Sequence, residues 1–408
     1  MKDKNQVFVV SLAITIIMAI WAVAFNANFT VVSNSAYSFL TNNFGWLYLM
    51  AMTAFVIFSV AIAFSKWGKI KLGPDDSKPE YSTVSWFAML FGAGMGVGLV
   101  FWGISEPLAH FSNPIPGIEA GTEAAANFAI RSSYMHWGLH PWANYCIIGL
   151  GLAYFQFRKG KPGLISSIFE PLIGEKGING WVGKTIDVLA VFATVAGVVT
   201  SLGLGVMQIN AGLNYLFGIP TTLVIQIIII AVISVIYIWS AVDGISRGIK
   251  IISDANLYIA IGLITVTFLV GPKLEILNNL TNGLGQYLQN FFGDSLMINN
   301  YGDNNWVGAW RVFYWAWWIA WAPFVGSFIA RISKGRTIRE FIAGVVLAPA
   351  LGSILWFAIM GSLGLHLGMD GTLSVAQLAD IASKPETGLF IVIGQYPLGM
   401  ILCVVSLI

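Results

Sequence analysis

Ten apolar stretches of about 20 residues each restrict what this chain can fold into. A helix of that length crosses the roughly 30 Å hydrocarbon core of a bilayer. Charged residues make up only 10% of the 408 residues, whereas soluble domains carry about 25%. We therefore predict an all-α membrane protein whose spans lie at about 7–29, 45–66, 83–103, 133–157, 185–216, 219–241, 252–271, 307–331, 340–364 and 388–408.

Lysines and arginines are concentrated on one side of the predicted spans. If the N-terminus is cytoplasmic, only four of the 21 basic residues face outside, namely Arg131, Lys273, Arg311 and Lys384. Cytoplasmic loops of membrane proteins carry an excess of Lys and Arg. The distribution therefore predicts a multi-pass protein of the cell (plasma) membrane with a cytoplasmic N-terminus.

The long outer segment 273–306 places apolar residues three or four positions apart, which puts them on one face of a helix. The predicted amphipathic helix either lies on the outer membrane surface or packs over the helix bundle. Its apolar face is made by Leu277, Leu280, Leu284, Tyr287, Leu288 and Phe291.

Alternating glycines weaken the third predicted span at Gly92, Gly94, Gly96 and Gly98. Each glycine inside a helix costs about 1 kcal/mol relative to alanine. Two interpretations are open at this point. The glycines either let helices approach closely, or they unwind the backbone beside a substrate or an ion.

Pro323 interrupts the eighth predicted span, five spans after the glycine-rich one. Two interrupted helices at this interval are typical of transporters built from two inverted repeats. We predict a five-plus-five inverted-repeat fold, with about ten spans present of an expected twelve. Its segments are an extra N-terminal helix pair at 1–82, a first repeat at 83–272, the connecting segment at 273–306 and an incomplete second repeat at 307–408.

Aromatic residues are concentrated in two predicted spans. Five tryptophans lie within Trp310–Trp321 in the eighth span, and the fourth span holds Trp137, Trp142 and Tyr145, with Gly138 placed to bend it. Aromatic faces bind cations that lack hydrogen-bond donors, such as a quaternary ammonium, at about 0.5–2 kcal/mol per ring. Aromatic residues at helical spacing are also common in packing and at membrane interfaces. From these residues alone, a cation box and simple packing are both open.

Other chemistry finds little support in the sequence. His136 and His140 are four residues apart, but no carboxylate or thiol pattern accompanies them, so we interpret them as hydrogen-bonded helix residues. Cys146 and Cys403 fall inside predicted spans and predict no disulfide framework. Glu106, at the outer end of the third span, is predicted to be interfacial. Without a phosphate loop or a dinucleotide fingerprint, we predict no enzyme, no organic cofactor, no metal other than sodium and no nucleic-acid partner.

Two long stretches resemble the betaine–choline–carnitine transporter family. The first is Gly94-Met-Gly-Val-Gly98, followed by Phe101-Trp-Gly-Ile-Ser-Glu-Pro107. The second runs from Tyr314-Trp-Ala-Trp-Trp-Ile-Ala-Trp-Ala-Pro-Phe-Val-Gly326 into Ala330-Arg-Ile-Ser-Lys-Gly-Arg-Thr-Ile-Arg-Glu-Phe341. The resemblance covers essentially the whole chain. It implies the fold of sodium-symporter-type transporters, a homotrimer in the bilayer, and a substrate with a trimethylammonium group.

The resemblance also implies where the substrate binds. The substrate would lie against the unwound third span, at Met95 and the flanking Gly94 and Gly96. Phe101 and Trp321 would line the pathway and its gates. The trimethylammonium group would be surrounded by Trp137, Trp142, Tyr145 and Trp318.

Sodium is the coupling ion that the resemblance implies. One sodium site would combine the backbone at Gly92 and Met95 with hydroxyl groups that would fall beyond the last residue given. The other would use two threonines in the fifth span and a phenylalanine in the eighth. Thr194 and Phe324 match that pattern, whereas Val198 occupies the second threonine position.

The sequence and the resemblance together predict a secondary active transporter that imports glycine betaine as an osmoprotecting compatible solute, coupled to sodium by alternating access. Gly98 leaves no acidic residue in the glycine stretch to favour choline. A choline or other quaternary-ammonium carrier of the same family, driven by protons, is one alternative. A non-transporting truncated membrane protein is another, because the chain ends in the tenth span. A membrane enzyme would need clustered acids or a nucleophile, and a passive channel would need a polar stripe.

Overall fold

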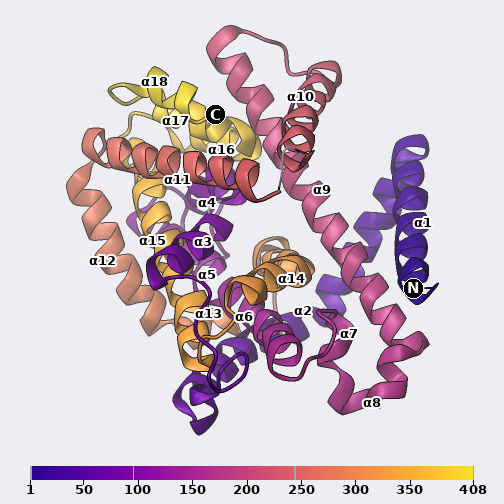
Figure 1. Cartoon of the computed structure of the whole chain (residues 1–408). Coiled ribbons are helices and arrows are strands. Elements are labelled where there is room, and N and C mark those ends of the chain that lie inside the picture. The colour runs from indigo at the N-terminus through magenta and orange to yellow at the C-terminus, as the bar shows by residue number, and fades with distance from the viewer. Residues whose placement is uncertain (1, 95, 243–244, 408) are drawn as a thin grey trace. The chain divides into compact units, whose positions relative to one another are not determined.

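The computed structural model describes residues 2–94, 96–242 and 245–407, and the side chains of these residues apart from 2–5, 93–94, 239–242 and 245–254. Within these ranges the chain forms helices and no strand (Figure 1). One isolated β-bridge joins Lys71 and Thr337. The all-α prediction is confirmed.

The helices follow the chain in this order: α1 Lys2–Ala24, α2 Asn26–Phe64, η1 Lys66–Lys69, α3 Thr83–Gly94, α4 Val97–Ser112, α5 Glu123–Trp137, α6 Leu139–Ala153, η2 Tyr154–Arg158, α7 Ile165–Ile168, α8 Glu170–Asn179, α9 Trp181–Phe217, α10 Leu223–Val242, α11 Ile245–Val270, α12 Lys273–Gln289, α13 Phe291–Ser295, η3 Val307–Val312, α14 Phe313–Ile332, α15 Ile338–Met369, α16 Val375–Ser383, α17 Pro385–Ile393 and α18 Gly399–Val405.

These helices form two compact units, each built from three separate stretches of chain. Unit 1 consists of Met1–Leu90, Leu139–Val199 and Phe292–Ala350. Unit 2 consists of Phe91–Gly138, Thr200–Phe291 and Leu351–Ile408. The predicted division into two repeats follows other boundaries and stays a prediction.

Both single helices and bent helix pairs are long and apolar enough to cross a membrane. By length and composition, five helices among the described residues can cross a bilayer, or up to seven if each of two bent pairs is one span. The five are Gln6–Ala24, Asn26–Phe64, Trp181–Phe217, Val307–Ile332 and Ile338–Met369. The two pairs are Thr83–Gly92 with Val97–Ser112, and Ala255–Val270 with Lys273–Gln289.

Two details of the predicted spans are wrong. Residues 30–44, expected to connect the first two spans, lie inside the 39-residue helix α2. Their polar residues lower the hydropathy, but no glycine or proline interrupts the helix before Gly45. Conversely, the predicted span 388–408 is two short helices, α17 and α18. Pro397 and the left-handed Leu398 (φ 61°) separate them.

The predicted amphipathic helix is present as α12, which packs against α5 in unit 2. Tyr287 is buried in this contact, whereas Leu277 and Leu288 are exposed. Gly283 allows the close approach, because a Cβ there would meet the Tyr134 ring at 2.8 Å. Of the two open interpretations, packing over other helices is the one that the described contacts support.

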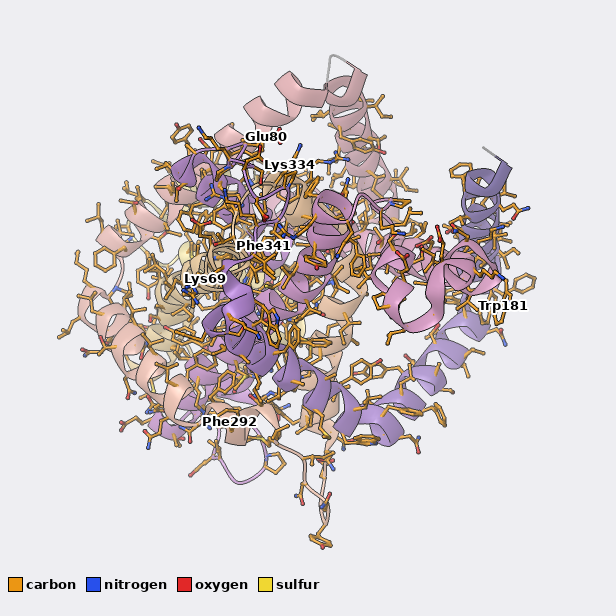
Figure 2. The ribbon with its side chains drawn as sticks, turned by 60° about the horizontal axis from the view of Figure 1, so that its bottom comes forward. Lys69, Glu80, Trp181, Phe292, Lys334 and Phe341 are labelled. Atoms are coloured by element: carbon orange, nitrogen blue, oxygen red, sulfur yellow. The ribbon has the colours of Figure 1, made fainter. Side chains whose placement is uncertain are left out.

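Three loops that were predicted on the cytoplasmic side come together in unit 1. The main chain of Leu72 exchanges hydrogen bonds with Arg336 and Gly335, both at 2.8 Å. Arg158 Nη1 donates to the Gly73 carbonyl at 3.0 Å. Glu80 and Lys334, which belong to two of these loops, lie near each other in Figure 2. The loops at 66–82, 158–161 and 333–338 therefore share one end of unit 1, as the charge pattern requires.

Candidate functional site

Helices α6 and α14 form the centre of unit 1, where they pack side by side (Figure 1). Glycines make this approach possible. A Cβ added at Gly149 of α6 would meet the carbonyl oxygen of Gly326 of α14 at 3.2 Å. This close contact brings together the aromatic residues of the fourth and eighth predicted spans.

Three of the four predicted box residues meet in unit 1. The ring centroids of Trp142 and Tyr145 are 5.5 Å apart, and those of Tyr145 and Trp318 are 6.3 Å apart, both edge to face. Trp318 also stacks on Trp317 at 4.9 Å and on Tyr314 at 5.8 Å. All five side chains are less than a tenth exposed. The result is a dense aromatic wall with several ring faces inside the protein.

The backbone at Trp318 is held by a side chain of α6. Buried Asn144 donates from Nδ2 to the Trp318 carbonyl oxygen at 2.8 Å. Pro323 lies five residues further along α14 and cannot donate a backbone hydrogen bond to the preceding turn. The helix is therefore weakened close to the point where Asn144 supports it.

Other rings of the tryptophan run have packing roles. Trp315 is fully buried and stacks on His140, with ring centroids 4.8 Å apart. The Nε2 atom of His140 is 3.0 Å from Ser295 Oγ. The interpretation of His140 as a hydrogen-bonded helix residue is confirmed, and Trp315 belongs to the packing of unit 1.

The predicted gate and sodium residues of unit 1 lie close together. Trp321 packs on α9, because a Cβ at Gly197 would meet its ring at 2.9 Å. It also contacts Phe324 edge to face, with ring centroids 5.6 Å apart. Thr194, one helical turn before Gly197, donates its hydroxyl to the Ala190 carbonyl at 2.8 Å. These positions are compatible with an ion site, and their role in binding sodium stays a prediction.

Trp137 belongs to unit 2, at the end of α5. Gly138 ends this helix with non-helical dihedral angles (φ −86°, ψ −124°), and α6 begins at Leu139. The helix is therefore interrupted at the glycine that the sequence placed to bend it. A side chain at Gly138 has no room, because its Cβ would collide with the backbone carbonyl oxygen of Tyr134 and would also meet Tyr287 Oη at 3.0 Å. Trp137 itself is buried beside Phe357, with ring centroids 5.4 Å apart.

The glycine-rich third span is broken, as expected if its glycines unwind the backbone. Helix α3 ends at Gly94 and α4 starts at Val97, with Gly96 in an extended conformation (φ −106°, ψ −178°). Gly92 lies within the last turn of α3, and Met95 lies outside the described residues. Phe101 is buried in α4, edge to face with Trp102 at 5.1 Å.

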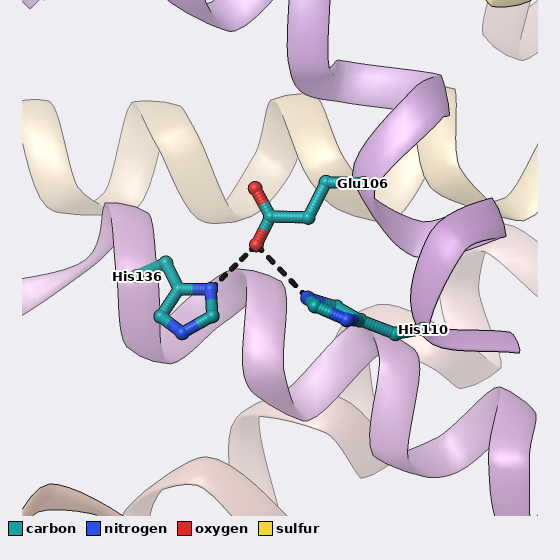
Figure 3. Close-up of side chains that lie close together, drawn as sticks. All are labelled: Glu106, His110 and His136. Atoms are coloured by element: carbon teal, nitrogen blue, oxygen red, sulfur yellow. Dashed lines mark hydrogen bonds and ion pairs between the residues drawn. The ribbon is translucent and has the colours of Figure 1, made fainter. Parts of the chain in front are cut away.

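Glu106 is fully buried in unit 2, so the prediction of an interfacial carboxylate is wrong. Its Oε1 is 2.6 Å from His136 Nδ1 and 3.4 Å from His110 Nε2 (Figure 3). Its Oε2 accepts a hydrogen bond from Trp137 Nε1 at 2.7 Å. These contacts join α4 to α5. The contacts to His136 and Trp137 could not be expected from sequence spacing, because both residues follow Glu106 by about 30 positions, whereas His110 is four residues away on the same helix.

The structure thus assembles two groups of candidate residues. Trp142, Tyr145 and Trp318 meet in unit 1, and Trp137 is held by the cluster around Glu106 in unit 2. That all four rings form one box stays a prediction. Clustered, buried aromatic rings favour binding of a cation over covalent chemistry.

Comparisons with known proteins agree with this chemistry. The profile described as "BCCT, betaine/carnitine/choline family transporter" matches residues 6–408. The glycine betaine transporter OpuD of Bacillus subtilis (strain 168) is 47% identical over 410 residues, covering 100% of this chain and 79% of that protein. The ectoine/hydroxyectoine transporter of Virgibacillus pantothenticus is 43% identical over 408 residues, covering 99% and 80%. The osmo-dependent choline transporter BetT2 of Acinetobacter baylyi (strain ATCC 33305 / BD413 / ADP1) is 39% identical over 402 residues, covering 97% and 58%.

Proposed function

The chain belongs to the betaine/carnitine/choline family of transporters, and we propose that this integral membrane protein imports glycine betaine in symport with sodium. Import would proceed by alternating access, in which a central substrate site opens to either side of the membrane in turn. The betaine would serve as a compatible solute that protects the cell against osmotic stress.

The observation that carries this proposal is the aromatic cluster of Trp142, Tyr145 and Trp318 in unit 1. Each ring facing a desolvated quaternary ammonium contributes about 0.5–2 kcal/mol, so three rings contribute roughly 1.5–6 kcal/mol. About 4 kcal/mol corresponds to a dissociation constant near 1 mM. The cluster alone is therefore strong enough to hold a trimethylammonium group at millimolar concentration.

The start of α4 favours betaine over choline. This helix begins at Val97 after Gly96, and no side chain caps its N-terminus. Backbone N–H groups and the helix dipole at such an end attract a carboxylate. Glycine betaine carries a carboxylate, whereas choline carries a neutral hydroxyl. Gly98 also adds no acidic side chain that would favour choline. A choline carrier is the second candidate, because a relative with 39% identity is named as one.

Sodium coupling is proposed from Thr194 and Phe324 in unit 1 and from the broken third span at Gly92 and Met95. A hydroxyl and freed backbone carbonyls are ligands that suit Na⁺ in broken membrane helices. We propose a homotrimer in the bilayer on the family resemblance. Light scattering of the detergent-solubilised protein tests this assembly.

The proposed function is tested by uptake of labelled glycine betaine, choline, carnitine and ectoine into proteoliposomes, with sodium present or replaced by potassium. We expect sodium-dependent uptake with betaine preferred. Uptake that does not respond to sodium, or choline taken up in preference to betaine, would contradict the proposal.

The aromatic site is tested separately with Trp318→Ala, which should raise the KM for betaine about 2- to 30-fold through the lost cation–π contact of about 0.5–2 kcal/mol. Trp310→Ala is the matched control. Trp310 belongs to the same run and stacks on Tyr314 at 6.2 Å, but it lies outside the predicted box. Equal KM values for the two variants, at equal amounts of folded protein, would remove Trp318 from the site.

A further inference from the structure

The buried cluster around Glu106 has a chemistry that the transport function does not by itself require. An ionised carboxylate has only acceptors. The network therefore needs protons on Trp137 Nε1, on His136 Nδ1 and, for the longer 3.4 Å contact, on His110 Nε2. One carboxylate oxygen faces the two imidazoles (Figure 3), and the other accepts the hydrogen bond from the indole of Trp137. A carboxylate held on both sides cannot rotate freely.

A metal site is the alternative reading of Glu106, His110 and His136, whose ligand atoms lie within 4.8 Å of one another. Two ligand atoms bound tetrahedrally to zinc at about 2.0 Å lie roughly 3.3 Å apart. The Glu106 Oε1 to His136 Nδ1 distance is 2.6 Å, which is the distance of a charge-assisted hydrogen bond. The geometry therefore favours a hydrogen-bonded network over a metal site.

The indole of Trp137 needs an external support because of its place in the chain. It is the last residue of α5, and Gly138 directly after it is not helical. Helix α6 begins at Leu139, after this break, so the ring is not flanked by a continuous helix on its C-terminal side. The support comes instead from Glu106 on α4, at 2.7 Å, and from Phe357 on the ring surface, at 5.4 Å between centroids.

We propose that Glu106 is a positioning residue that fixes the Trp137 indole in the orientation in which it receives the quaternary ammonium group of the substrate. The inference rests on the proposed function, because it requires a quaternary ammonium substrate for Trp137 to contact. His136 and His110 orient the carboxylate, and the carboxylate orients the indole. Residues that hold a binding group in place lower the cost of ordering it when the ligand arrives.

The experiment measures KM and kcat for betaine uptake in proteoliposomes for Glu106→Gln, Trp137→Phe and the double variant. Glutamine keeps the size of the side chain but offers one acceptor oxygen in place of two. Trp137→Phe keeps an aromatic ring but removes the N–H donor. Each single variant should raise KM about tenfold, with kcat nearly unchanged. The double variant should also raise KM about tenfold, because both changes remove the same interaction.

The matched control is Trp356→Phe in the same unit. Trp356 Nε1 donates to the buried Leu99 carbonyl at 2.8 Å, so this variant also loses a buried indole hydrogen bond. It should lower thermal stability without changing KM. A KM increase in Trp356→Phe equal to that in Glu106→Gln would overturn the inference, because any loosening of unit 2 would then have the same effect.

Two further outcomes are decisive. Multiplicative effects in the double variant would show that Glu106 acts independently of Trp137 and would refute the positioning role. If Glu106→Gln does not reach the membrane, Trp137→Phe alone must raise KM while Trp356→Phe does not. If the wild-type protein transports betaine and Glu106→Gln has the same KM as the wild type, only this inference is refuted. Wild-type protein that transports no quaternary ammonium compound refutes the proposed function itself.

Discussion

Replacement of Asn144 by alanine should weaken substrate binding without touching the predicted aromatic box. Asn144 is 3% exposed and donates to the Trp318 carbonyl oxygen at 2.8 Å. The hydrogen bond joins α6 to α14 a little over one turn before Pro323, where α14 lacks a backbone donor. Without Asn144, the segment that carries Trp318 loses this hydrogen bond to the neighbouring helix.

The size of the effect follows from the contact that is lost. A buried hydrogen bond contributes about 0.5–1.5 kcal/mol, and the shorter side chain leaves a small cavity, so about 1–2 kcal/mol is expected in total. The Trp318 carbonyl can still accept from its own helix, and no orphaned acceptor is added. If the whole loss acts on the orientation of Trp318, KM for betaine rises about 5- to 30-fold.

The control is Asn210→Ala in unit 2. Asn210 is also buried and donates from Nδ2 to the Pro220 carbonyl oxygen at 3.2 Å, and neither of these two residues is a predicted site residue. Both variants should lower the melting temperature measured in detergent, but only Asn144→Ala should raise KM in the uptake assay. If KM is unchanged in Asn144→Ala while both melting temperatures fall alike, the hydrogen bond stabilises unit 1 but does not position Trp318, and the reasoning is refuted.

Two further variants test the packing around the site. Gly138→Ala should lower the yield of folded protein, because the added Cβ would collide with the backbone carbonyl oxygen of Tyr134, and overpacking costs about 1–3 kcal/mol; an unchanged melting temperature would mean that the break between α5 and α6 tolerates a side chain. Arg336→Lys should speed proteolytic cleavage in loop 66–82, because the guanidinium lies 4.0 Å from the centre of the Trp86 ring and donates to the Tyr81 carbonyl, and lysine cannot stack and donate in the same way; cleavage at the wild-type rate would contradict this role.

Local breaks and helix faces could be predicted from the sequence because they depend on neighbouring residues. The alternating glycines interrupt the third span between Gly94 and Val97, and Gly138 ends α5. The apolar spacing in 273–306 predicted α12. Trp142 and Tyr145 share a helix face because they are three residues apart. In each case the local structure depends on the conformational preference of a single residue or on the spacing of apolar residues within one helix.

Contacts between distant segments could not be predicted in this way. Glu106 at the end of an apolar stretch looks interfacial, but its burial depends on His136 and Trp137, which a different helix supplies. The stacking of His140 on Trp315 joins residues 175 positions apart in the chain. The low hydropathy of the polar stretch 30–44 likewise predicted a connecting loop. The stretch instead continues helix α2, because it contains no helix-breaking residue.

The two polar side chains that most clearly support predicted box residues have a common property. Asn144 in unit 1 and Glu106 in unit 2 each lie in an apolar helix, and each bonds to a tryptophan on another helix. Burying a polar group in apolar surroundings is unfavourable unless it is fully hydrogen-bonded. A leucine or an alanine would pack these helices at lower cost. Each polar residue therefore makes sense if the position of the tryptophan that it holds matters, as the proposed binding of a methylated cation requires.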